Sequence, residues 1–180
     1  MIFRLSQKLN TKIKAGTLQA MPLDDNPLAD WSASLFVADR TPYILVSNTK
    51  SLYSAVLYGK GVTNVTHFIE RAMSSIRELM EDDGQEFVHQ RFIAPTTASI
   101  TFAKALDRSV TGSMNDLIYH ATAWLATGDV SPHDVGFRLN DILLSAIAPN
   151  ESEPYGRPRE AFKALLNKVE AETPQNGALR

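Results

Sequence analysis

Two hydrophobic spacings alternate along this chain, and together they predict strands and helices in one sequence. Segments rich in β-branched and aromatic residues, several with the two-residue alternation of a strand, occur at residues 2–5, 31–38, 43–48, 52–58 and 98–103. The sequence between the second and third of them, Asp-Arg-Thr-Pro, is typical of a turn. These two segments are therefore expected to form a β-hairpin.

The other segments repeat apolar residues at steps of three and four, which indicates amphipathic helices. The clearest helix covers residues 65–80, and we expect further helices at residues 6–15, 110–127, 132–143 and 161–169. Ser6, Ser109 and Ser131 stand at the N-cap positions of three of them. Residues 85–93 fit both spacings, and we interpret them as a helix.

This order of elements predicts an α+β protein, with a mainly antiparallel β-sheet of about four to five strands and helices packed on one side. A single domain is expected at residues 1–148, because a chain of 180 residues that is 44% hydrophobic suits one full-sized core. Residues 149–170 are expected to form a linker and a C-terminal amphipathic helix packed on this domain. Residues 171–180 are expected to be a flexible tail.

Charge and composition narrow the range of functions. There are 18 Lys and Arg residues against 20 Asp and Glu residues, so the chain lacks the positive excess of a protein that binds nucleic acid or an anionic membrane. It has no cysteine, which excludes disulfides, thiolate metal sites and cysteine nucleophiles. It also lacks the apolar run of a secretory signal or a membrane-spanning helix, so we expect a soluble cytoplasmic protein.

Two stretches allow more than one interpretation. Residues 16–30 form a long loop with two prolines, and loops of this length often bind a partner or cover a sheet edge. Glu81, Asp82 and Asp83 place negative charge at the C-terminal end of a helix, against its dipole. We interpret these carboxylates as serving solubility, and the alternative is that they face a cationic group inside or outside the fold.

The candidate functional site is the polar sequence Asp-Arg-Ser-Val-Thr-Gly-Ser-Met-Asn-Asp at residues 107–116, which joins a predicted strand to a predicted helix. A helix start exposes unpaired backbone N–H groups, and a nearby arginine adds positive charge, so such a corner attracts anions. The candidate residues for binding an anion or a partner are Arg108, Ser109, Gly112, Ser113, Asn115 and Asp116.

A structural role is our preferred interpretation of this corner. Ser109 would cap the helix, Gly112 would allow close packing, and Arg108 would pair with a carboxylate of the fold. The alternative is that Arg108 binds the phosphate or carboxylate of a ligand.

No catalytic or metal site is predicted. Ser113, Asp116 and His120 supply the residue types of a hydrolase triad, but the serine and the histidine are separated by about 10 Å along a helix, whereas a triad needs them in contact. The four histidines lack the spacing of metal ligands, and the common hydrolase and nucleotide-binding motifs are missing. We therefore expect no cofactor.

Several segments resemble a bacterial family of domains of unknown function. They are Leu-Ser-Gln-Lys-Leu at residues 5–9, Trp-Ser-Ala-Ser-Leu-Phe at 31–36, Ile-Leu-Val-Ser-Asn at 44–48 and Arg-Ser-Val-Thr-Gly-Ser-Met-Asn-Asp at 108–116. The resemblance extends from Met1 to about Leu143, and the chain departs from it at Asp107, where the family often has asparagine. It implies no activity and no catalytic residue. Fusion of some relatives to domains like those of plasmid or insertion elements implies a role around mobile elements or defence.

Two functional hypotheses follow from these observations. The leading one is a non-enzymatic cytoplasmic module that binds an anionic small molecule or a protein partner. The alternative is a small enzyme or a nucleotide- or anion-binding protein that uses the corner from Arg108 to Asp116. We expect neither nucleic acid nor a membrane as a partner, and the sequence leaves the oligomeric state open.

Overall fold

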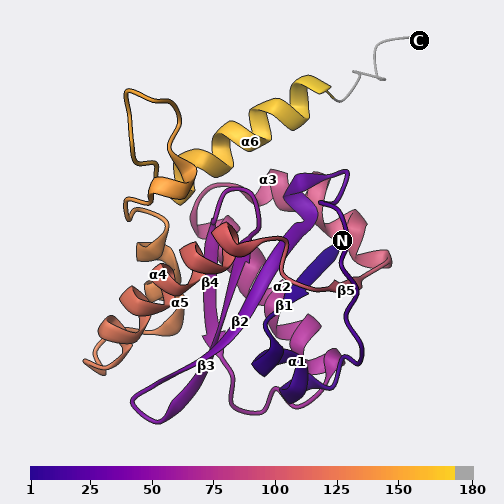
Figure 1. The fold of residues 1–180 in the computed structure, drawn as a ribbon, viewed down its shortest axis with the longest axis vertical. Helices are drawn as coiled ribbons and strands as arrows, with labels where there is room; N and C mark the ends of the chain where they lie inside the picture. Colours follow the sequence, from indigo (N-terminus) through magenta and orange to yellow (C-terminus); the bar gives the residue numbers. More distant parts are fainter. Residues whose placement is uncertain (173–180) are drawn as a thin grey trace.

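The computed structural model describes residues 1–172 and shows strands and helices in the predicted alternation (Figure 1). The strands are β1 (Ile2–Leu5), β2 (Asp30–Ala38), β3 (Thr41–Asn48), β4 (Ser54–Tyr58) and β5 (Thr101–Ala103). The α-helices are α1 (Gln7–Ile13), α2 (Val65–Asp82), α3 (Glu86–Val88), α4 (Arg108–Leu125), α5 (Pro132–Leu139) and α6 (Pro158–Glu172). Short 3-10 or π-helical turns are η1 (Pro27–Ala29), η2 (His89–Ile93), η3 (Ala94–Ala98) and η4 (Ser145–Ile147). The helical interpretation of residues 85–93 is confirmed. Of the predicted tail, Ala171 and Glu172 belong to α6, and the residues from 173 onward lie outside the described part.

The fold is α+β, and its sheet is mixed. The strands lie in the order β4-β3-β2-β1-β5. β2 pairs antiparallel with β3, as the predicted hairpin requires, and β3 pairs antiparallel with β4. β1 pairs parallel with both β2 and β5, so the sheet is mixed rather than purely antiparallel, and the antiparallel pairs are the longer ones. The parallel pairs arise because long connections with helices, rather than tight turns, precede β2 and β5.

Helices cover both faces of the sheet, which corrects the prediction of helices on one side (Figure 1). Ile44 and Val46 of β3 join one core with α1 and α2, whereas Tyr43 and Leu45 join a second core with α4 and α5. Successive side chains of a strand point to opposite faces, so β3 is buried on both. The sequence pattern could not show how many helical layers exist, because apolar residues on both faces fit either arrangement.

The start of α4 and the end of α5 differ from the prediction. The N-cap of α4 is Asp107, whose carboxylate accepts a 2.9 Å hydrogen bond from the Val110 N–H group, and not Ser109. Aspartate and serine are comparable caps, so their order in the sequence could not decide between them. α5 is shorter than predicted, and Leu143 is exposed instead of extending its buried side.

A buried ion pair joins β1 to β2. The Arg4 side chain, which is 1% exposed, donates from Nε and Nη2 to the two carboxylate oxygens of Asp30, each at 2.8 Å. Its guanidinium also donates to the carbonyl oxygens of Met21 and Pro22 at 3.0 and 2.7 Å. Such a network satisfies buried charges that would otherwise destabilise the fold strongly.

Residues 16–30 cover both this ion pair and an edge of the sheet. Gln19 forms a parallel bridge with Ala103 of the edge strand β5, and the Lys104 N–H group donates to the Gln19 carbonyl oxygen at 2.9 Å. One of the two interpretations of this long loop, the covering of a sheet edge, is therefore confirmed.

α5 packs directly on the backbone of β4. A Cβ atom on Gly136 would lie 2.9 Å from the Val56 backbone nitrogen, so the close approach requires glycine. The Asn140 side chain accepts a 2.7 Å hydrogen bond from the Ser54 N–H group and donates to the Ser54 carbonyl oxygen at 3.0 Å. It thus acts as an extra peptide group at the start of β4.

The acidic end of α2 meets an arginine and a histidine within the fold. Asp83 pairs with Arg159 of α6 and accepts a 2.8 Å hydrogen bond from the Tyr53 hydroxyl. Asp82 lies 2.7 Å from the imidazole of His133 at the start of α5. The interpretation of this cluster as a solubility feature is wrong for these two carboxylates, because they join α2 to α5 and α6.

Candidate functional site

The predicted corner is an exposed helix start and not a structural lock. Arg108 is exposed, and within residues 1–172 its side chain makes no hydrogen bond or ion pair. A Cβ atom on Gly112 would contact nothing within 4 Å, so close packing does not require glycine there. The structural roles expected of both residues are therefore wrong, because the first turn of α4 faces solvent.

The serines of this corner line a small cavity at the start of α4. The cavity has a volume of about 140 Å³, and Ser109 and Ser113 both contribute to its wall. Ser113 is buried and donates a 3.0 Å hydrogen bond to the Ser109 carbonyl oxygen, so its hydroxyl is already satisfied. Asn115 and Asp116 are exposed farther along the helix and do not contribute to this wall. A role of the six residues in binding stays a prediction.

This small cavity shares part of its wall with a larger groove beside α6. The groove has a volume of about 540 Å³, and Lys50, Ala146 and Ile147 belong to both walls. We call the two hollows together the α6 groove. Its apolar wall comes mainly from η4 and α6, with Ala146, Ile147, Ala161, Ala164 and Leu165, and its basic residues are Lys50, Arg157 and Lys168.

Local hydrogen bonds hold the walls of the α6 groove in place. The turn that carries Lys50 is fixed by Asn48, whose side-chain oxygen accepts from the Lys50 N–H group at 3.2 Å. Across the groove, Leu144 and Gly156 exchange two backbone hydrogen bonds of 2.9 Å, which close the loop that begins with η4. A Cβ atom on Gly156 would lie 2.0 Å from the Ile147 carbonyl oxygen, so this closure needs glycine.

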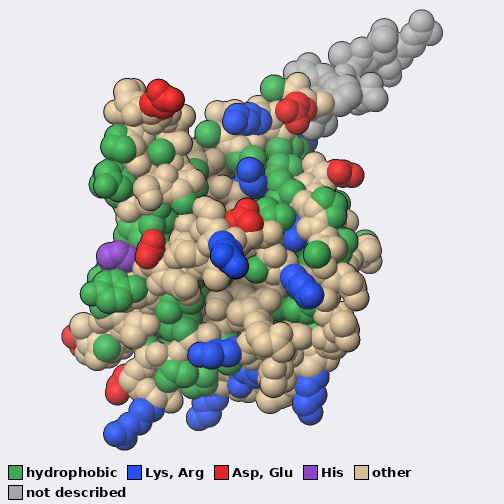
Figure 2. All heavy atoms as spheres, in the orientation of Figure 1, with side chains coloured by type: hydrophobic (Ala, Val, Ile, Leu, Met, Phe, Trp, Pro, Cys, Tyr) green, Lys and Arg blue, Asp and Glu red, His purple; other side chains and the backbone are tan. Residues whose placement is uncertain are grey.

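The basic side chains of the α6 groove have no partner among the described residues. Lys50, Arg157 and Lys168 form no side-chain hydrogen bond or ion pair with any described residue. The walls also hold two carboxylates: Asp107 caps α4, and Glu160 lies 3.9 Å from the Lys163 ammonium group in an exposed pair within α6. Figure 2 shows Lys and Arg side chains on and near α6, beside a notch between this helix and the loop that precedes it. The groove therefore presents positive charge next to an apolar wall.

The sequence interpretation missed most of this groove. The spacing of residues 157, 161, 164 and 168 could have indicated it, because this spacing places two cations and two alanines on one side of the C-terminal helix. Arg159, two residues after Arg157, is locked instead by Asp83 and by Asp141 at 3.0 Å. Only the three-dimensional arrangement separates the paired arginine from the unpaired one.

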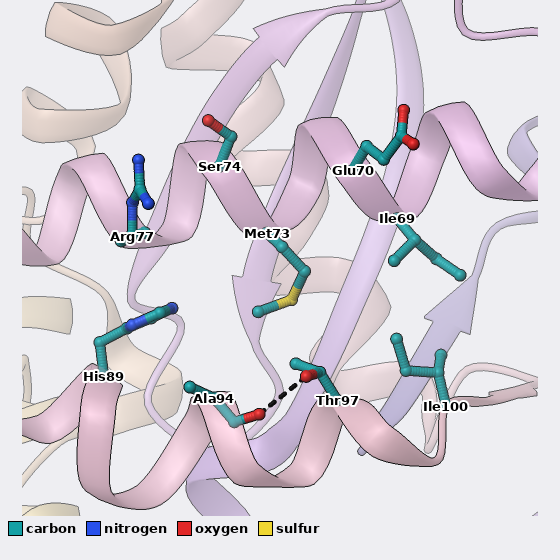
Figure 3. Close-up of a pocket in the computed structure, with 9 residues that line it drawn as sticks. All are labelled: Ile69, Glu70, Met73, Ser74, Arg77, His89, Ala94, Thr97 and Ile100. Carbon is teal, nitrogen blue, oxygen red and sulfur yellow. Dashed lines mark hydrogen bonds between the residues drawn. The ribbon is translucent and has the colours of Figure 1, made fainter.

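A second cavity lies between α2 and the segment from η2 to η3 (Figure 3). Its volume is about 500 Å³. Its wall includes Ile69, Met73 and Arg77 of α2 and, on the facing segment, His89. His89 is 8% exposed, and its Nε2 atom is buried with no hydrogen-bond partner among the described residues. A buried polar atom without a partner is costly, so this cavity has one unsatisfied group in its wall.

Burial lowers the pKa of His89 below its ordinary value of 6.5, and the positive charge of Arg77 lowers it further, against the opposite effect of Glu81. Besides Arg77, the described wall of this cavity contains one charged residue, Glu70. As the pH falls below 6.5, the unfolded chain binds a proton at this histidine before the folded protein does, so stability is lost.

We expect the free energy of unfolding to fall less in the His89→Leu variant than in the wild type when the pH is lowered from about 7.5 to about 5.5. Urea unfolding at several pH values measures this difference, and the other titrating groups contribute equally to both proteins. Equal pH dependence in the two proteins would contradict the prediction.

The chain is thus a small α+β protein with a mixed five-stranded sheet, with the α6 groove on one side and a second cavity beside α2. The chain belongs to the family described as a domain of unknown function, DUF6933, which it matches over residues 2–161. Neither the curated proteins nor the solved structures include a match to it. None of the helices in the described part is long and apolar enough to cross a membrane. Within the same part, no group of three His, Asp or Glu residues could hold a metal ion.

Proposed function

We propose that this protein is a non-enzymatic binding module of the bacterial cytoplasm, and that the α6 groove binds an acidic, partly apolar segment of a partner protein. The observation that carries the proposal is the set of three cations with unpaired side chains, Lys50, Arg157 and Lys168, in the same groove as an apolar wall. A cytoplasmic location is supported by the absence of cysteine.

The chemistry of the walls favours a peptide segment over a small anion. Ala161, Ala164 and Leu165 offer apolar surface that a phosphate ion would leave uncovered, whereas a segment that alternates acidic and apolar residues would cover it. The larger hollow of the α6 groove, with a volume of about 540 Å³, also exceeds the needs of a single phosphate group. Binding through the cations then sets the orientation of the segment.

Fluorescence anisotropy with a labelled peptide of alternating glutamate and leucine tests the proposal. The double variant Lys50→Ala with Arg157→Ala should bind it about tenfold more weakly, because two charged contacts are lost. The matched control is Lys8→Ala with Lys12→Ala on α1, which removes the same charge far from the groove and should change the affinity by less than about twofold. Equal losses in both variants, or equal binding of a glutamine and leucine peptide, would show that the groove is not the site.

A second candidate function is small-anion binding at the corner from Arg108 to Asp116. The observation that favours it is the exposed Arg108 side chain without an internal partner, at the start of an 18-residue helix. Inorganic phosphate should then raise the melting temperature of the wild type and not that of Arg108→Ala. Equal shifts in the two proteins would remove this candidate.

A further inference from the structure

The cavity between α2 and the η2–η3 segment has a polar end and an apolar end. Ile69, Met73 and Arg77 recur at steps of four on one flank of α2, so they line about 12 Å of its length. Ile100 lies opposite Ile69, and His89 lies near Arg77 (Figure 3). A ligand that follows this cavity would meet apolar surface at one end and nitrogen donors at the other.

Most polar groups of the wall are already satisfied within the fold. The Thr97 hydroxyl donates to the Ala94 carbonyl oxygen at 2.7 Å, and the Ser74 hydroxyl donates to the Glu78 carboxylate at 2.7 Å. Arg77 uses its Nε group in a 3.4 Å ion pair with Glu81. Its terminal N–H groups make no hydrogen bond within residues 1–172, which leaves them available to a ligand. Nε2 of His89 has no hydrogen-bond partner either, but a ligand reaches it only after a neighbouring side chain moves.

The terminal N–H groups of Arg77 and the Nε2 atom of His89 suit a carboxylate ligand. The terminal nitrogens of an arginine match the two oxygens of a carboxylate, and the neutral imidazole of His89 adds a hydrogen-bond donor but no charge. Among the described residues, Arg77 is the one arginine or lysine in this cavity wall, so a single negative charge fits better than a phosphate dianion. Glu70, nearer the apolar end, repels a carboxylate there and so fixes the direction of the ligand.

We infer that this cavity binds a medium-chain aliphatic monocarboxylate, with its chain along Ile69, Met73 and Ile100 and its carboxylate on Arg77 and the Nε2 atom of His89. Figure 3 shows the end of the Met73 side chain directed toward the His89 ring. Because Nε2 is sealed from solvent, Met73 rotates aside when the carboxylate binds, as the flexible methionine side chain allows. This site is independent of the α6 groove.

Calorimetric titration with sodium octanoate, below the concentration at which it forms aggregates, tests the inference. Octanoate should bind the wild type at least about tenfold more tightly than octanol, which lacks the charge, or acetate, which lacks the chain. Arg77→Gln and His89→Leu should each weaken octanoate binding by about tenfold or more. Octanoate should also shift the imidazole NMR signals of His89.

The controls separate this site from general binding and from the α6 groove. Arg138→Gln removes an exposed arginine of α5 and should change octanoate affinity by less than about twofold. The Lys50→Ala and Arg157→Ala double variant should also bind octanoate normally. Equal affinity for octanol and octanoate, or wild-type affinity in Arg77→Gln, would overturn the inference. The exposed Arg77 provides this test even if the His89→Leu variant does not fold.

Discussion

Replacing Arg4 with methionine is expected to lower the free energy of unfolding by about 3–5 kcal/mol, the largest loss that we predict for a single substitution. The change keeps much of the side-chain volume but leaves the buried carboxylate of Asp30 without its cation. The carbonyl oxygens of Met21 and Pro22 lose their donors as well. Chemical unfolding with urea, followed by circular dichroism, measures the loss.

Two further variants show whether the buried pair is the cause. Arg138→Met removes an exposed arginine and should cost less than about 0.5 kcal/mol. Arg4→Met combined with Asp30→Leu should recover part of the stability, because it removes the unpaired buried charge. A loss of less than about 1 kcal/mol in Arg4→Met alone would mean that water reaches Asp30 and that the pair does not hold the two strands together.

Replacing Asn140 with alanine is expected to lower the free energy of unfolding by about 2–4 kcal/mol. Asn140 is fully buried, and the change leaves the N–H and carbonyl groups of Ser54 without the partner that the amide provides. The Gly136 carbonyl oxygen loses a 3.1 Å hydrogen bond at the same time. Differential scanning calorimetry and urea unfolding both report the effect.

Asn150→Ala is the matched control for this prediction. The Asn150 side chain also accepts several hydrogen bonds, among them one of 3.0 Å from the Ser152 N–H group, but it lies in an exposed turn. Water replaces hydrogen bonds that are lost at an exposed site, so we expect a loss of less than about 1 kcal/mol. If the two alanine variants lose equal stability, burial of the Asn140 amide is not what makes it important.

The stability network and the proposed binding sites use different residues. Arg4, Arg159 and Asn140 are engaged by the fold, whereas the side chains of Lys50 and Arg157 have no partner within residues 1–172. Substitutions in the α6 groove should therefore change binding with little effect on stability. This separation makes the binding experiments interpretable, because weaker binding in those variants does not reflect unfolding.

The sequence predicted the elements of the fold and only part of its assembly. The hairpin of β2 and β3 followed from two alternating segments around a turn, and α2 followed from its regular apolar spacing. The parallel pairing of β1 did not follow, because strand pairing depends on contacts between residues far apart in sequence. The second helical layer was missed for the same reason.

The candidate site shows the same limit at the level of single arginines. The chain has both paired and unpaired arginines: Arg108 was expected to pair with a carboxylate of the fold, yet the buried pair belongs to Arg4 and Asp30. Arg4 stands in a short apolar strand. Its partners, Asp30 and the Met21 carbonyl oxygen, are distant in sequence and come close to it only in the folded chain. Local sequence gives no sign of either partner.

By itself, the sequence determined the periodic elements, the α+β class and the absence of cysteine chemistry, because these depend on residues that are close together in the chain or on composition alone. Tertiary structure alone decided which charges are satisfied and which are free. It brought Lys50 to Arg157 across the α6 groove and left His89 Nε2 without a partner beside Arg77. Hydrogen bonding and burial depend on neighbours in space, which the one-dimensional pattern does not specify.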